Sequence, residues 1–176
     1  MAGKVGQGLV QPGYLGIPFD LVRELTEIYR NNLPAGKLSD VVLGIHLHVG
    51  REREEAIASG ALALSSQADV FLRGRLGRPV QTESIQTYAS KSASRQAFEK
   101  LCTPEKARQA VETEETKIRA AWGTPDDGIE KIKFYVDDMH PEQLMFNTAS
   151  GSLAQDKVLT SMRLCAEPVM PALRRM

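Results

Sequence analysis

A strict alternation of apolar residues over 41–49 is the clearest pattern in the chain. One face of this segment carries only β-branched or leucine side chains, at Val41, Leu43, Ile45, Leu47 and Val49. Period-two alternation predicts a strand. The other face carries Gly44, His46 and His48. A strand that is apolar on one face and polar on the other is typical of a β/α barrel near its mouth, where one face meets helices and the other meets the lumen.

Two weaker apolar segments, 6–10 and 143–148, are also predicted as strands because turn residues bound them. Apolar residues at helical spacing predict helices between and after the strands. We expect a helix after an Asp20 N-cap that buries Leu21, Val22, Leu25, Ile28 and Tyr29, and further helices over 53–72, 125–139 and 152–171. Residues 73–121 are expected to form a helical insertion.

Cap residues support two of these helix starts. Thr124 precedes Pro125, which is the preferred order of an N-cap and a first helical residue. Asp126 and Asp127 are therefore interpreted as first-turn carboxylates rather than as a metal or phosphate motif. Ser152 with Gln155 three residues later predicts a capping box for the final helix, whose buried side chains should include Leu153, Val158, Met162, Cys165 and Val169, with Pro171 as its end.

The sum is three strand-then-helix units. A complete (β/α)8 barrel takes about 250 residues, whereas this chain has 176 residues. We therefore predict an α/β fold that corresponds to about the last three β/α units of a TIM barrel. Residues 1–176 would form a single domain, with the insertion before the last strand.

Composition narrows the classes of partner. The chain has 22 basic and 22 acidic residues and a formal charge of zero, so we expect neither nucleic acid nor a membrane surface as a partner. The two cysteines form no C-x-x-C pair, and no apolar run approaches the roughly 20 residues that span a bilayer. The expectation is a cytoplasmic protein.

The C-terminal half resembles a known family. The motifs are Trp122-Gly123-Thr124-Pro125-Asp126-Asp127, the strand Leu144-Met145-Phe146, and the helix Val158 to Pro171 containing Cys165-Ala166-Glu167-Pro168. With the upstream His46-Leu47-His48-Val49, they resemble the end of the luciferase-like flavin-dependent monooxygenases, which include bacterial luciferase and alkanesulfonate monooxygenase. The alkanesulfonate branch carries Arg where this chain has Gly44, so a sulfonate substrate is not implied.

This resemblance implies a cofactor and partners. Family members use reduced FMN, supplied by a partner flavin reductase, and dioxygen to oxidise a small organic substrate, and a deazaflavin-dependent relative is a close variant. The first five strands of the family barrel, and the serine-rich loop that binds the flavin phosphate, have no counterpart here. The chain would therefore form a homo-oligomer or pair with a complementing N-terminal barrel half.

The two strand histidines are the first candidate site residues. An imidazole can donate a hydrogen bond to developing negative charge or shuttle a proton near neutral pH, so His46 is the candidate catalytic residue and His48 a candidate substrate-binding residue. A purely structural hydrogen bond in the lumen is an equal alternative for both. No third ligand stands at a suggestive spacing, so we expect no metal site.

The remaining candidates lie in loops. The resemblance places Asn147, Ser150 and Gly151, after the last strand, beside the cofactor, although this loop could merely start the final helix. Arg75, with Arg73 and Arg78, could clamp an anionic substrate group, although such clusters are usually only solvated.

Three functional hypotheses remain open. The chain is part of a flavin-dependent enzyme, or a non-catalytic assembly partner or remnant, or a small unrelated α/β binding module. Three barrel strands leave two unpaired sheet edges, which favours association with another chain.

Overall fold

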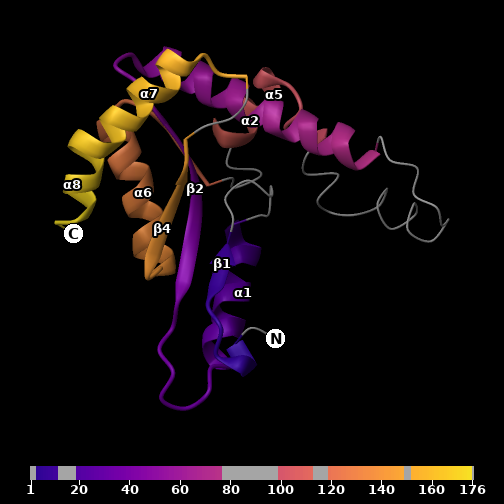
Figure 1. Cartoon of the computed structure of the whole chain (residues 1–176), viewed down its shortest axis with the longest axis vertical. Helices are drawn as coiled ribbons and strands as arrows, with labels where there is room; N and C mark the ends of the chain where they lie inside the picture. The colour runs from indigo at the N-terminus through magenta and orange to yellow at the C-terminus, as the bar shows by residue number, and fades with distance from the viewer. Residues whose placement is uncertain (1–2, 12–18, 77–98, 113–118, 149–151, 176) are drawn as a thin grey trace.

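The computed structural model describes residues 3–11, 19–76, 99–112, 119–148 and 152–175, without the side chains of 71–76. In these ranges four parallel strands form one sheet, and helices pack on it. The strands are β1 (Leu9–Gln11), β2 (Val41–Val49), β3 (Ala120–Gly123) and β4 (Gln143–Asn147). Figure 1 shows β2 as the long central strand.

Strand β2 pairs with all three of the others. Its first half pairs with β1 in the register Leu9 to Val41, and its second half pairs with β3 in the register His46 to Ala120. Strand β4 pairs with residues 42–46 of β2, which include residues that also pair with β1 or β3. Therefore β4 occupies one edge of β2, while β1 and β3 follow one another along its other edge.

Strand β3 corrects the sequence-based expectation. Residues 120 and 121 were expected to end a helical insertion over 73–121, but they are extended and pair with Leu47 and its neighbours. The helix before the insertion is also longer than expected, because α2 (Arg53–Leu76) continues four residues past the expected end at Leu72. The expected strand at 6–10 is displaced to Leu9–Gln11. Helix α5 (Pro104–Glu112) is the described helical part of the insertion.

The apolar face of β2 forms the main core, as its alternation predicts. Val41, Leu43, Ile45, Leu47 and Val49 are each at most 1% exposed. The last four of them pack with Phe19 and Val22 of α1 (Phe19–Asn31), with α6 (Pro125–Met139), and with Cys165 and Val169 of the C-terminal helix. Burying five such side chains removes a large apolar area from water, which is the main driving force for this part of the fold.

The opposite face of the sheet is referred to below as the histidine face, because it carries His46 and His48. In-register residues of parallel strands share a face, so Ala120, Trp122 and Asn147 also lie here. Ala120 and Trp122 form a second core with Ala61, Leu64 and Ala68 of α2 and Leu101, Ala107 and Ala110 from the α5 region.

The C-terminal helix is continuous but irregular. It consists of α7 (Gln155–Leu164), a π-helical segment η2 (Cys165–Val169) and α8 (Met170–Leu173). Pro168 has no N–H to donate, which accounts for the widened turn at η2. Pro171 lies inside α8 instead of ending the helix as expected. Met162 is 48% exposed, so its predicted burial is also wrong.

The helix caps are partly as predicted. Thr124 and Asp127 form a reciprocal capping box at α6, with Asp127 N–H donating to Thr124 Oγ1 and Thr124 N–H donating to Asp127 Oδ2 at 2.8 Å. The Ser152 capping box is wrong, because the N-cap of α7 is Ala154 and Ser152 donates a hydrogen bond to Ser66 instead. Asp20 lies within α1, where it pairs with Arg23.

Gly60 on α2 permits the contact between that helix and the sheet. A Cβ atom added here would lie 2.6 Å from the Trp122 ring, which is a closer approach than side-chain atoms tolerate. Glycine in a helix interior ordinarily costs about 1 kcal/mol relative to alanine, so close packing is the physical reason for this residue.

We predict that Gly60→Ala destabilises the protein by about 1–3 kcal/mol, because overpacking outweighs the gain in helix propensity. Urea unfolding measures the effect. The matched control is the same substitution in a Trp122→Ala background, where the ring is gone and Gly60→Ala should be neutral or stabilising. Equal destabilisation in both backgrounds would contradict the assignment.

Candidate functional site

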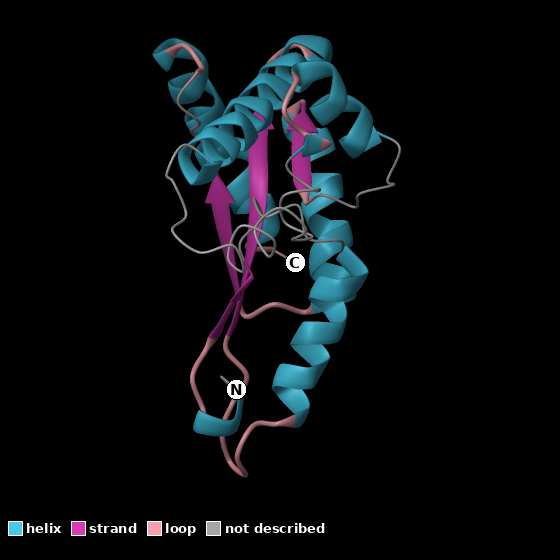
Figure 2. Ribbon diagram, turned by 90° about the vertical axis from the view of Figure 1, so that its right-hand side faces the viewer, coloured by secondary structure: helices cyan, strands magenta, loops and turns pink. Residues whose placement is uncertain are grey.

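The carboxyl end of β2 lies under two helices. Figures 1 and 2 show the strands pointing toward the end of the sheet where α2 and α7 lie. A buried hydrogen bond fixes α7 there, since Val49 N–H donates to Ser161 Oγ at 3.0 Å. The carboxyl ends of the strands are where β/α barrels place their chemistry.

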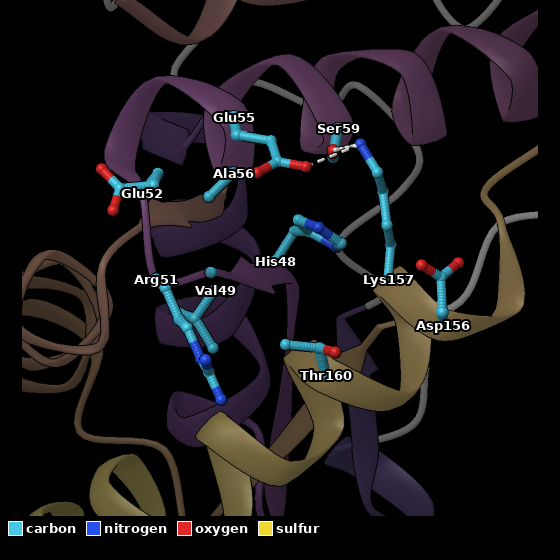
Figure 3. Close-up of a pocket in the computed structure, with 11 residues that line it drawn as sticks. His48, Val49, Arg51, Glu52, Glu55, Ala56, Ser59, Asp156, Lys157 and Thr160 are labelled. Carbon is cyan, nitrogen blue, oxygen red and sulfur yellow. Dashed lines mark hydrogen bonds and ion pairs between the residues drawn. The ribbon is translucent and has the colours of Figure 1, made fainter.

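A pocket of about 390 Å³ opens at this end, between α2 and α7. Figure 3 shows the side chains that surround it. The lining residues come from the end of β2 and the turn after it, from the first turns of α2, and from α7: His48, Val49, Gly50, Arg51, Glu52, Glu55, Ala56, Ser59, Asp156, Lys157 and Thr160.

His48 forms the floor of the pocket. Its side chain is 5% exposed, and its Nδ1 atom is buried without a hydrogen-bond partner among the described residues. Burial lowers the pKa of His48; the ammonium of Lys157 lowers this pKa further, and the carboxylate of Glu55 opposes the effect. The imidazole is therefore mainly neutral at pH 7, with one nitrogen to donate and one to accept.

Lys157 reaches across the pocket from α7 to α2. Its Nζ atom lies 3.0 Å from Glu55 Oε1 and donates to Ser59 Oγ at 3.4 Å. The Glu55 side chain is 63% exposed, whereas Ser59 is buried. Lys157 is 98 positions from Ser59 along the chain, so no local pattern in the sequence predicts that Lys157, Glu55 and Ser59 lie together.

His46 lies two residues earlier on the same face and is 3% exposed. Its Nε2 atom is buried and has no hydrogen-bond partner among the described residues. Burial, together with the positive charge of Arg119, lowers the pKa of His46 to about 4. The ring is therefore neutral in any buffer near pH 7.

Arg119 is a buried cation that the sequence analysis missed. It is 2% exposed, and its Nε donates to the carbonyl oxygen of Gly44 at 3.0 Å. Burial lowers the pKa of Arg119 to about 10, while Tyr135 acts in the opposite direction, so the guanidinium stays charged at neutral pH. The residue immediately precedes β3, which is why it was hidden in a segment interpreted as helical.

The other sequence-predicted site residues are placed only in part. Asn147 ends β4, half-buried and in register with His46, so these two candidates come together. Ser150 and Gly151 lie outside the described residues, and so does Arg78. Arg73 and Arg75 belong to the last turns of α2, where side chains are not described.

This arrangement supplies two neutral imidazoles, an amide and an ammonium at one end of a parallel sheet. Neutral imidazoles can exchange protons with a bound molecule, and the ammonium can bind an anionic group. Among the described residues no group of three or more His, Cys, Asp and Glu side chains is arranged to hold a metal ion.

The pKa of His46 generates a prediction about stability. Unfolding restores an ordinary histidine pKa near 6.5, so the unfolded chain takes up a proton that the folded chain refuses at pH values between about 4 and 6.5. Stability is therefore full above pH 6.5 and falls by about 1.4 kcal/mol for each pH unit below it. Between about pH 7.5 and pH 5, His46 should cost the wild type about 2 kcal/mol.

We predict that His46→Gln removes this part of the pH dependence, as measured by urea unfolding at the two pH values. Ser161→Ala is the control, because it deletes a buried hydrogen bond without removing a titrating group, and its loss of stability should be the same at both pH values. A His46→Gln curve parallel to that of the wild type would show that the histidine titrates normally.

Sequence comparisons give no relative. No model of a known protein family matches the chain, and no curated protein matches it either. In the described part of the chain no helix has the length and apolar character needed to cross a membrane.

Solved structures do share its fold. A monooxygenase, RslO1 from Streptomyces bottropensis, superposes with a TM-score of 0.62 at 16% identity, over 98% of this chain and 44% of its own. The apo form of MsnO8 gives a TM-score of 0.59 at 16% identity, over 99% of this chain and 47% of its own. A coenzyme F420-dependent tetrahydromethanopterin reductase from Methanopyrus kandleri gives 0.52 at 16% identity, over 97% and 46%.

The chain thus spans less than half the length of these structures. Its parallel α/β sheet with covering helices shares the fold of part of each of these three structures.

Proposed function

We propose that this chain is part of a β/α-barrel oxidoreductase that acts on a small organic substrate with a flavin or deazaflavin cofactor. The observation that carries the proposal is His46: a neutral imidazole with an unpartnered Nε2, buried on the histidine face near the carboxyl ends of the strands. The shared fold with a monooxygenase and an F420-dependent reductase supports the reaction class.

The residues of this chain fit one part of such a cofactor. When bound, a reduced FMN would supply two electrons to dioxygen, of which one oxygen atom would go to the substrate and the other to water, or a deazaflavin would exchange a hydride. His46 Nε2 and the Asn147 amide lie on one face in register and could bind polar atoms of a ring or substrate. His48, farther toward the pocket, would bind the substrate.

Within this proposal His46 moves or holds a proton. A neutral imidazole keeps one N–H group. It can therefore donate a hydrogen bond to an oxygen atom on which negative charge develops. Arg119 acts through His46. Its positive charge disfavours protonation of the His46 ring and so helps to keep the imidazole neutral. In the FMN variant of the proposal, a partner flavin reductase supplies the reduced cofactor.

The sheet edges support the proposal that another chain associates with this one. Among the described strands, β1, β3 and β4 pair only with β2, so no described strand adjoins the outer edge of any of the three. Leu21, Leu25 and Ile28 form a stripe on α1 that is 40–50% exposed, although the sequence predicted their burial. Free strand edges beside an exposed apolar helix face are typical of an association surface.

We propose that a second copy of the chain, or a complementing N-terminal barrel half, covers these edges. The family resemblance assigns the loop that binds the cofactor phosphate to the N-terminal half of the barrel, so a complementing N-terminal half would complete the cofactor site, whereas a second copy would only cover the edges. The resulting assembly is the proposed working form.

A second candidate function is a non-catalytic assembly partner or remnant. The low exposure of His46, 3%, favours this alternative, because a cofactor must reach the ring to use it. The two functions differ in whether cofactor binds.

We predict that FMN or deazaflavin absorbance elutes with a defined oligomer when the purified chain is analysed by size-exclusion chromatography with light scattering. A flavin-free oligomer or broad aggregate would instead support the non-catalytic function. A flavin-free monomer with sharp cooperative unfolding would contradict both functions, because the chain would then be a stable domain without a partner that covers its sheet edges.

We also predict that His46→Gln lowers cofactor-dependent turnover of the assembly by about 100-fold, because a hydrogen-bond donor directed at developing negative charge typically contributes 10²–10³-fold. Glu54→Gln, which alters a carboxylate that pairs with Arg108 outside the proposed chemistry, serves as the comparison. Wild-type turnover in His46→Gln would remove the catalytic role.

A further inference from the structure

The pocket between α2 and α7 contains an exchangeable ion pair. Lys157 and Glu55 are in contact at 3.0 Å, but their side chains are 41% and 63% exposed. Such exposed pairs are weak, because water and salt screen the two charges and both long side chains lose freedom. Glu55 can therefore leave Lys157 at little cost if another carboxylate replaces it.

One residue that lines the pocket contains a buried nitrogen atom without a partner among the described residues. His48 lines the pocket, and its Nδ1 is buried without a partner among the described residues. Leaving a buried polar atom without a hydrogen bond is costly, so such atoms usually indicate a missing ligand or water. Figure 3 shows the His48 ring below the point where Lys157, Glu55 and Ser59 converge.

The charges around the pocket restrict the ligand. Lys157 and Arg51 are its cations, and Glu52, Glu55 and Asp156 are its carboxylates. Each added negative charge on a ligand is repelled by the three carboxylates, so a single charge is favoured over a double one, and a carboxylate that displaces Glu55 leaves the charge beside Lys157 unchanged. The volume of about 390 Å³ also suits a small molecule.

We propose that this pocket binds a small monocarboxylate, whose carboxylate takes the place of Glu55 on Lys157 and accepts hydrogen bonds from Ser59 and His48. The inference deepens the proposed function and rests on it for one step, the identification of this ligand as the substrate. Binding itself is independent of cofactor. Glu55 then acts as an internal competitor that holds the site closed when the ligand is absent.

The test uses the full chain at pH 7 with butyrate and its uncharged analogue butyramide as probes. Binding is followed by the imidazole NMR signals of His48, assigned with His48→Gln, and by calorimetry. Butyrate should bind about tenfold more tightly than butyramide, since only the carboxylate can replace Glu55. The bound carboxylate should also shift the His48 signals toward those of the protonated ring.

Three variants separate this site from a general charge effect. Lys157→Met should weaken butyrate binding by about tenfold, because it removes the cation. Glu55→Gln should strengthen it severalfold, because it removes the competitor. The matched control is Glu54→Gln, which makes the same charge change one residue away, where the carboxylate instead pairs with Arg108 of α5 at 2.8 Å; it should leave butyrate binding unchanged.

Glu55→Gln keeps the proposal falsifiable even if Lys157→Met disturbs the fold. Equal binding of the two probes, no binding of butyrate, or weaker binding in Glu55→Gln would each overturn the carboxylate site. A bound butyrate in a chain that takes up no flavin would support the pocket and contradict only the oxidoreductase. Flavin uptake without butyrate binding would support the oxidoreductase and contradict the carboxylate site.

Discussion

Strand β2 is hydrogen-bonded along both of its edges and buried on both faces over most of its length, and the other described elements are organised around it. Strict alternation of apolar residues places one half of its side chains in the core with α1 and α6. The same alternation forces His46 and His48 onto the opposite face. A shift of one residue in register would exchange the two sets and place both imidazoles in the apolar core.

This constraint connects folding with the proposed chemistry. Because the stretches of β2 that pair with β3 and with β4 meet at His46, Arg119 and Asn147 are brought beside this histidine from two distant segments. Because Ser161 fixes α7 to the end of β2, Lys157 is held above His48. The elements that pack against β2 therefore bury His46 and His48, and this burial keeps both imidazoles neutral.

The sequence predicted the parts of this arrangement that are encoded locally. The period-two pattern of 41–49 and the Thr124–Asp127 cap depend on neighbouring residues, and the structure confirms both. Strand β3 was missed because it has four residues and two of them are alanines, which favour helices. Ser152 matched a capping pattern, but Ser66 of another helix competes for its hydroxyl.

The sequence predicted only those residues of the candidate site that lie on strands β2 and β4. His46, His48 and Asn147 follow from strand positions, whereas Lys157, Glu55 and Ser59 depend on how α7 packs against α2. Tertiary packing also decides which side of α1 is buried: Val22 is in the core, while Leu25, equally apolar, is exposed. Because Val22 and Leu25 are both apolar, the sequence alone does not show which side of α1 packs into the core.

Amide hydrogen exchange of the purified chain, resolved by residue, tests the central role of β2 most directly. The account predicts that the β2 amides, above all those of Val42, Leu43 and His46, whose residues pair with strands on both sides, are the slowest in the protein and exchange only by global unfolding, while the strands β1 and β4 exchange sooner. Exchange of the β2 amides as fast as that of β1 or α1 would contradict the account, because β2 would then not be the element on which the structure depends.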